Sequence, residues 1–132
     1  MKKFDSMQDY FNQTVAYMLT QKNRCVNEKN YCVYLNDEGN KCAIGYWIPK
    51  DHEALGCEEA ISTLFAEYPE LSGVAWPKGE YGLDLAESLQ YLHDEERYRV
   101  FHDKGSEFSE EGTRKVGQIC KTFNLKNPLE TI

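Results

Sequence analysis

The segment from Tyr31 to Pro49 constrains the fold most, because two apolar, β-prone runs flank a single turn signal there. That signal is Asn36-Asp37-Glu38-Gly39, in which Gly39 can take the left-handed conformation that closes a short loop. The patterns on either side are helical, and a lone hairpin is only marginally stable in water. The sequence therefore predicts an α+β fold in which four or five helices pack around one antiparallel β-hairpin at about residues 31–47.

Within this hairpin, a three-residue loop places Tyr34 opposite Cys42 and Cys32 opposite Ile44 on one buried face. Gly45, which has no side chain, predicts a bulge or a close backbone approach near the end of the second strand.

Caps and apolar stripes predict the helices. They are expected after Ser6, between Cys57 and Tyr68, from Asp84 through His93, and after Ser109, with Asn124 as a left-handed terminator. The segment from Arg97 to Phe101 is expected to extend the third helix or to begin another. The chain has 132 residues, and residues 1–132 are expected to form a single globular domain.

The N-terminal segment has no apolar core of a signal peptide, and no window has the roughly 18 apolar residues of a membrane span. These features predict a cytoplasmic protein. The five cysteines are odd in number and unevenly spaced, which favours thiols over a disulfide framework. No cofactor is expected.

The net charge of −7 is unevenly distributed along the chain. Between Asp51 and Glu111 there are sixteen acidic residues and four basic ones, so this segment carries −12 and the remainder +5. The charge argues against direct binding of the segment to nucleic acid or to an anionic membrane, and it favours a partner with a basic surface. The alternative is a solvated face that only aids solubility.

The familiar catalytic and metal-binding motifs are absent from the sequence, including Cys-x-x-Cys, His-Glu-x-x-His, Gly-x-Gly-x-x-Gly and Gly-x-Ser-x-Gly. Cys32 and Cys42 share a face of the predicted hairpin, but they are diagonal neighbours and nothing specifies two further ligands, so no metal site is predicted.

One catalytic set is possible by residue type: Cys42 as nucleophile, His93 as base and Asp94 orienting the histidine. A cysteine in a hairpin lacks the helix N-terminus that commonly lowers the thiol pKa. A buried structural thiol with a core histidine is therefore the favoured interpretation.

Three segments together resemble a family of small proteins. They are Leu19-Thr-Gln21, then Cys32-x-Tyr34 with Gly39-Asn-Lys-Cys-Ala-Ile-Gly45 and Ile48-Pro49, and finally Leu89-Gln-x-x-His-Asp94. The pattern is similar to that of a functionally uncharacterised family found in bacteriophages, prophages and bacterial genomes.

The resemblance implies a small acidic phage-type binding protein that inhibits or modulates a host or defence protein in the host cytoplasm. Residues expected at the interface are Tyr34, Tyr46, Trp47, Trp76, Glu58 and Glu59. One alternative is a cysteine-dependent enzyme that uses Cys42 and His93. Another is a protein that sequesters a small ligand in a pocket lined by Tyr34, Tyr46 and His93.

Overall fold

The structure is a computed structural model that describes residues 3–29, 32–57 and 60–130. This part of the chain contains four α-helices and one two-stranded antiparallel sheet, so the predicted α+β class is confirmed. The helices are α1 (Met7–Thr20), α2 (Ile61–Glu67), α3 (Glu80–Asp94) and α4 (Glu110–Phe123). The strands are β1 (Arg99–His102) and β2 (Gly105–Phe108). Short 3-10 helices cover Glu53–Gly56, Pro69–Leu71, Glu96–Tyr98 and Pro128–Glu130.

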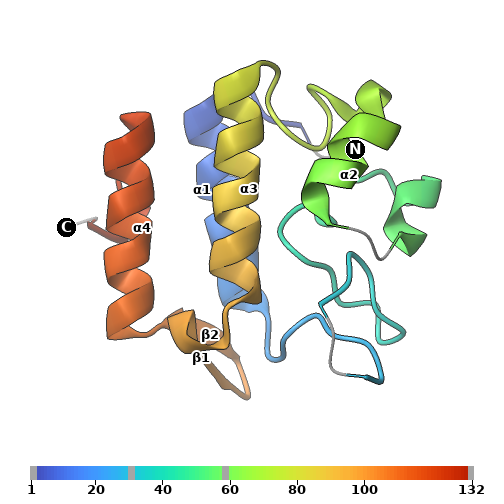
Figure 1. Ribbon diagram of the computed structural model, residues 1–132. Helices are drawn as coiled ribbons and strands as arrows, with labels where there is room; N and C mark the ends of the chain where they lie inside the picture. Colours follow the sequence, from blue (N-terminus) through green and yellow to red (C-terminus); the bar gives the residue numbers. More distant parts are fainter. Residues whose placement is uncertain (1–2, 30–31, 58–59, 131–132) are drawn as a thin grey trace.

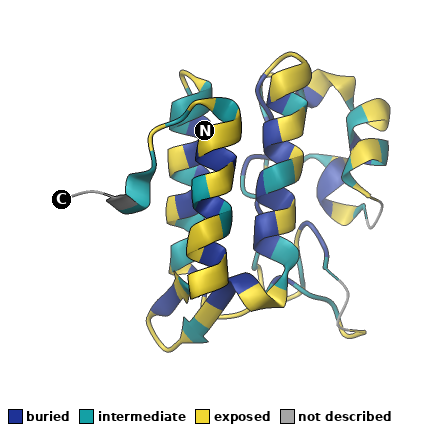
Figure 2. Ribbon diagram, turned by 60° about the vertical axis from the view of Figure 1, so that its left-hand side comes forward, coloured by how far each residue is buried: buried dark blue, intermediate teal, exposed yellow. Residues whose placement is uncertain are grey.

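Helices α1, α3 and α4 run side by side, and the hairpin lies across the end of this layer where α1 and α3 terminate (Figure 1). Helix α2 and the irregular segments on either side of it lie beyond α3. The helices bury one face each and expose the other (Figure 2). The predicted stripe of α3 is confirmed as core, since its members are all buried: Leu85, Ala86, Leu89, Leu92 and His93.

Capping residues in the sequence predict most of the observed helix ends correctly. The Ser6 side chain accepts a hydrogen bond from the Asp9 amide at 3.0 Å, and Ser109 accepts one from the Gly112 amide at 3.1 Å. Asn124 ends α4 in the left-handed conformation, with φ 56° and ψ 50°. These short-range contacts depend on neighbours in the sequence, which is why the sequence alone identifies them.

The predicted start of α3 at Asp84 is wrong, because the helix begins at Glu80. No side-chain cap marks this start, and Gly79 precedes it with a φ of 92°. A side chain at Gly82 would lie 2.0 Å from the carbonyl oxygen of Pro77, so the first turn packs tightly on the loop before it. That contact is tertiary, and the capping pattern at Asp84 could not reveal it.

The predicted location of the hairpin is also wrong. The antiparallel ladder pairs Arg99 with Phe108 and His102 with Gly105, so a strand stands where the sequence predicts a helix from Arg97 to Phe101. Arg99 is buried and Val100 is exposed, which is the alternation of a strand on a core surface. β2 packs on the end of α1, where the Ser106 hydroxyl donates to the Met18 carbonyl at 2.9 Å.

The segment at 31–47 keeps the predicted register only around its turn. Leu35 and Lys41 form an isolated antiparallel bridge, and Gly39 has the expected left-handed φ of 82°. Beyond Cys42 the backbone folds onto itself, because the Tyr46 amide donates to the Cys42 carbonyl at 3.0 Å instead of pairing across a ladder. Cys32 forms its bridge with Val26, not with Ile44, and Tyr31 lies outside the described residues.

Gly45 confirms the predicted close approach. A side chain there would lie 2.1 Å from the carbonyl oxygen of Tyr34. Within the described ranges, no helix has both the length and the apolar character needed to cross a bilayer.

Candidate functional site

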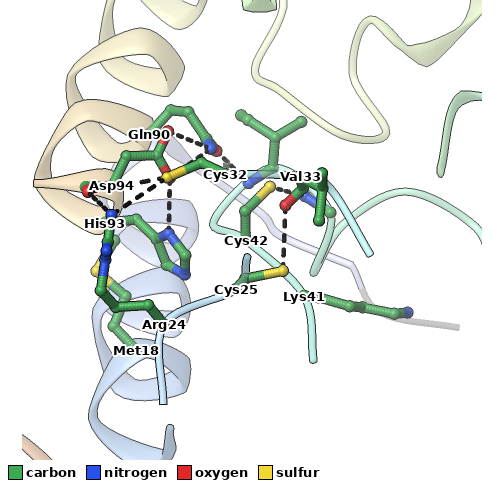
Figure 3. Close-up of polar contacts among 12 residues, drawn as sticks. Met18, Arg24, Cys25, Cys32, Val33, Lys41, Cys42, Gln90, His93 and Asp94 are labelled. Carbon is green, nitrogen blue, oxygen red and sulfur yellow. Dashed lines mark hydrogen bonds and ion pairs between the residues drawn. The ribbon is translucent and has the colours of Figure 1, made fainter. Parts of the chain in front are cut away.

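The last turn of α3 places Gln90, His93 and Asp94 in one hydrogen-bonded group (Figure 3). The Gln90 amide nitrogen donates to both carboxylate oxygens of Asp94, at 3.1 and 3.0 Å, while its carbonyl oxygen accepts from the Ile44 amide at 3.1 Å. His93 Nδ1 lies 3.0 Å from Asp94 Oδ1. Spacings of three and four residues bring these side chains to one side of the helix. The group therefore links the end of α3 to the turn after Cys42.

His93 is 2% exposed, and burial lowers its pKa below the ordinary value although the Asp94 carboxylate acts in the opposite direction. Its Nε2 atom is buried without a well-formed hydrogen bond among the described residues, and the Lys41 carbonyl favours protonation only weakly. The ring is therefore neutral near pH 7, with the Nδ1 hydrogen donated to Asp94.

Cys42 is fully buried, and its sulfur accepts a hydrogen bond from the Gly45 amide at 3.2 Å. Burial raises the pKa of the Cys42 thiol strongly, and the negative charge of Asp94 raises it further. No hydrogen bond joins Cys42 to His93 in the described ranges. The structure brings His93 and Asp94 together as predicted, but it leaves the thiol in the protonated form, which is a weak nucleophile.

Cys25 lies near both Cys32 and Cys42. No disulfide joins them, and all five cysteines are present as thiols. Cys25 is 1% exposed and donates to the carbonyls of Val33 and Asn40 at 3.1 and 3.0 Å, and burial raises its pKa to about 12. Cys32 is half-buried, and burial followed by the charge of Asp94 raises its pKa. In the described ranges, no group of three or more cysteine, histidine or acidic side chains is placed to hold a metal ion.

Two arginines that the sequence did not single out complete the group. Arg24 donates from one nitrogen to the Asp94 carbonyl oxygen at 3.3 Å and to the Cys32 sulfur at 3.7 Å. Arg99 donates to the carbonyl oxygens of Met18 and His93 at 2.8 and 3.1 Å, so it ties the ends of α1 and α3 together. Arg24 is 70 residues from Asp94, and Arg99 is 81 residues from Met18, so no local pattern could have identified these contacts.

The three motif segments of the family resemblance meet at this place. Gln21 donates to the Asn40 side chain at 2.7 Å and to the Lys41 carbonyl at 2.6 Å, which joins the first segment to the second. Gln90 joins the second segment to the third through Ile44. Hydrogen bonds of Gln21 and Gln90 thus connect these three segments of the chain to one another.

The aromatic residues predicted at the interface have different environments. Trp47 is 3% exposed and donates to the Thr14 hydroxyl at 2.8 Å, while Trp76 is 2% exposed and packs on Phe65 with ring centroids 4.6 Å apart. Both indoles are core side chains, and neither is available to a partner. Tyr46 is half-buried and stacks on Tyr17 at 4.4 Å.

Among the described residues predicted at the interface, Tyr34 lines the cavity beside α3, and it is 5% exposed. Glu58 and Glu59 lie outside the described residues. The cavity has a volume of about 390 Å³ and lies between α3, the start of α2 and the segment after Cys32. Its described walls are Cys32, Val33, Tyr34, Ala60, Ile61, Glu87, Gln90, Tyr91 and Asp94. His93 and Tyr46, which the ligand-sequestering hypothesis placed in such a pocket, do not line it.

Gln90, Glu87 and Tyr91 are site residues that sequence reasoning missed. Gln90 carried a usable signal, because its spacing of three and four residues from His93 and Asp94 predicts contact on one helix face. A larger hollow of about 970 Å³ lies on the other side of Val33. Its walls mix basic, acidic and apolar side chains, among them Lys22, Arg24, Glu38 and Phe101, so it indicates no single ligand chemistry.

Comparison with protein-family models, with curated proteins and with solved structures finds no match to this chain. Its function is therefore considered from the geometry and charge of the site.

The state of Cys42 gives a first testable prediction. Native Cys42 is expected to resist iodoacetamide at pH 8 until the protein unfolds, because its pKa in the folded state lies above the ordinary value near 8.5. Cys42→Ser is expected to lower the free energy of unfolding by about 1 to 3 kcal/mol, since it places a hydroxyl in an apolar site. Mass spectrometry of the alkylated protein, with and without urea, measures the first effect, and urea titration measures the second.

The half-buried Cys57 is the internal control, because it is expected to react before Cys42 in the native protein. Rapid native alkylation of Cys42 that disappears in His93→Ala, with the fold intact, would contradict the structural role and support the cysteine-dependent enzyme.

Proposed function

We propose that this chain is a small phage-type binding protein that inhibits or modulates a host or defence protein with a basic surface. The observation that carries the proposal is the exposed side of α3, defined here as the α3 acidic stripe. It consists of Glu80, Tyr81, Asp84, Glu87 and Tyr91. Most of these positions recur at intervals of three and four residues, so they form one strip along the helix.

The composition of the stripe favours a protein partner. Tyr81 is 76% exposed and Tyr91 is 44% exposed, while α3 contains no lysine or arginine. Tyrosine is enriched at protein interfaces, and carboxylates around it select a basic surface and speed its approach. Basic groups meet the stripe at its end, where Lys115 lies 5.3 Å from the centre of the Tyr91 ring. Among the described residues, no lysine or arginine forms an ion pair with Glu80, Asp84 or Glu87.

The proposal predicts that immobilised protein recovers a stoichiometric partner from host lysate, and that its affinity falls as salt rises. Screening acts over about 10 Å at 0.1 M salt, so an association steered by exposed carboxylates weakens at higher ionic strength. Affinity for the recovered partner is then measured by calorimetry for a stripe variant. This variant carries Glu80→Gln, Asp84→Asn and Glu87→Gln, and it is expected to bind at least about tenfold more weakly.

The matched control removes the same charge from exposed positions outside α3. It carries Glu38→Gln, Glu67→Gln and Glu107→Gln. Equal weakening of both variants would show that only net charge matters, and recovery of no partner from several candidate hosts would count against the binding function.

The cavity of about 390 Å³ beside the stripe supports a second candidate, the sequestering of a small ligand. Under this function, only Tyr34 among the predicted lining residues would contact the ligand. The enzyme hypothesis is tested by the iodoacetamide alkylation of Cys42 described above.

A further inference from the structure

The Asp94 carboxylate is held firmly, and the buried Arg99 guanidinium acts on it electrostatically without forming an ion pair among the described contacts. Its side chain is 28% exposed, and it accepts hydrogen bonds from the Gln90 amide and the neutral His93 ring, while the Cys32 thiol also interacts with it. Arg24 donates to the backbone carbonyl of Asp94 and not to its carboxylate. No lysine or arginine in the described ranges forms an ion pair with Asp94. Such a carboxylate is oriented in advance and attracts a positive charge from outside.

The cavity that Asp94 lines suits an elongated cationic group. Glu87 lines the same cavity two helical turns earlier, about 10 Å along the axis of α3. The remaining walls include the apolar residues Val33 and Ile61 and the aromatic residue Tyr34. No lysine or arginine is among its described walls. The cavity therefore offers negative charge at separated points and an apolar surface between them.

The hydrogen bonds on Asp94 discriminate between the two basic side chains. Gln90 Nε2 lies within 3.1 Å of both carboxylate oxygens, where one arm of a guanidinium fork would have to lie. The orientation of the Gln90 amide is fixed, because its oxygen accepts from the Ile44 amide. His93 occupies a further site on Oδ1, so Oδ2 accepts fewer of these hydrogen bonds than Oδ1 does. A single-point donor such as an ammonium fits Oδ2 better than a bidentate guanidinium.

We infer that the cavity lined by Asp94, Glu87 and Tyr34 binds an alkylammonium group, supplied by a lysine side chain of the partner. The ammonium donates to Asp94 Oδ2, and the methylene chain lies along Ile61 and Tyr34. Glu87 stands at the outer part of the cavity, within the α3 acidic stripe. This inference rests on the proposed binding function for the source of the lysine, while the preference of the cavity for an alkylammonium rests on its geometry alone.

The test uses amide chemical shifts of the whole chain, titrated with N-acetyl-lysine methylamide. Saturable shifts at Cys32, Gln90 and Asp94 are expected, with the norleucine and arginine analogues binding at least about tenfold more weakly. Norleucine keeps the apolar chain without the charge, and arginine keeps the charge with the wrong geometry. A spermidine titration distinguishes the source, because tighter binding of spermidine than of the lysine probe would assign the cavity to a free polyamine and overturn the partner lysine.

Variants assign the charge to individual carboxylates. Asp94→Asn is expected to weaken lysine binding at least about tenfold, and Glu87→Gln about two- to threefold. Asp103→Asn, an exposed aspartate in the hairpin turn, makes the same chemical change outside the cavity and is expected to bind as the native chain does. Should Asp94→Asn fail to fold, Glu87→Gln, the two analogues and the spermidine titration still decide the outcome. Shifts that do not saturate, shifts unchanged in the carboxylate variants, or equal binding of arginine would each overturn the inference.

Failure of the cavity and failure of the proposed function give different results. If the lysine probe binds but no lysate yields a partner, the alkylammonium site is supported and the inhibitor function loses its support. If a partner is recovered but the probe does not bind, the α3 acidic stripe acts without a lysine pocket.

Discussion

Replacing Arg99 with alanine is expected to lower the free energy of unfolding by about 3 kcal/mol. Arg99 is 4% exposed, and its guanidinium donates to Met18 at 2.8 Å, to Gln21 Oε1 at 2.9 Å and to His93 at 3.1 Å. The substitution removes the guanidinium from all three acceptors, of which the Met18 carbonyl keeps its bond from Ser106, and it removes the contact that holds β1 against the ends of α1 and α3. Urea unfolding followed by circular dichroism measures the change.

Arg99→Lys separates charge from geometry, because one ammonium cannot reach acceptors on both helices as the forked guanidinium does. It is expected to recover less than half of the lost stability. Arg114→Ala is the control, since Arg114 has a side chain 65% exposed and pairs only with Glu110 at 3.4 Å among the described residues. Its expected effect is within about 0.5 kcal/mol. A loss below about 1 kcal/mol for Arg99→Ala would show that the cost of burying the charge cancels its hydrogen bonds.

Gly45→Ala is expected to destabilise the fold by at least about 3 kcal/mol, because the new methyl group meets backbone that cannot move aside cheaply. An added Cβ would lie 2.1 Å from the Tyr34 carbonyl oxygen and 3.3 Å from the Cys42 nitrogen. That carbonyl accepts a hydrogen bond from the Cys42 amide at 3.2 Å, so relief of the clash breaks the link between the two sides of the turn. The unfolding midpoint in urea reports the effect.

A second readout tests the location of the damage. Because Gly45 packs over the turn that contains Cys42, alkylation of Cys42 in Gly45→Ala is expected to be faster than in the native chain under folding conditions. Gly56→Ala is the matched control, since an added Cβ there meets no atom of the described residues within 4 Å. It is expected to change stability by no more than about 0.5 kcal/mol in either direction. Similar losses for the two glycines would mean that the close approach at Gly45 is not rigid.

The strand pairing shows where sequence reasoning failed. The turn at Gly39 has the predicted register, but its ladder stops after the bridge of Leu35 with Lys41. The segment from Arg99 to Phe108 forms the ladder, with alternating burial along β1 and a glycine at φ 143° opening β2. Both segments have strand and turn signals. Two properties of the assembled fold decided which segment forms the ladder. One is that the backbone donors after Cys42 find acceptors within their own turn, and the other is that α1 packs on the segment that contains β2.

The sequence by itself determined those features whose partners lie within one or two helical turns. These are the capped starts of α1 and α4, the left-handed residues Gly39 and Asn124, and the buried stripe of α3. The contact of His93 with Asp94 belongs with them, because adjacent residues at the end of a helix need no distant partner to meet.

Only the tertiary structure decided the chemical state of the site. Cys42 had the residue type of a nucleophile, but complete burial and the negative charge of Asp94 raise its pKa and keep it protonated. Arg24 reaches the end of α3 from a distant segment, and Arg99 reaches the end of α1 from one, while the acidic cavity forms only where α3 meets the chain after Cys32. Burial and long-range charge depend on the whole packed chain, so no window of sequence contains them.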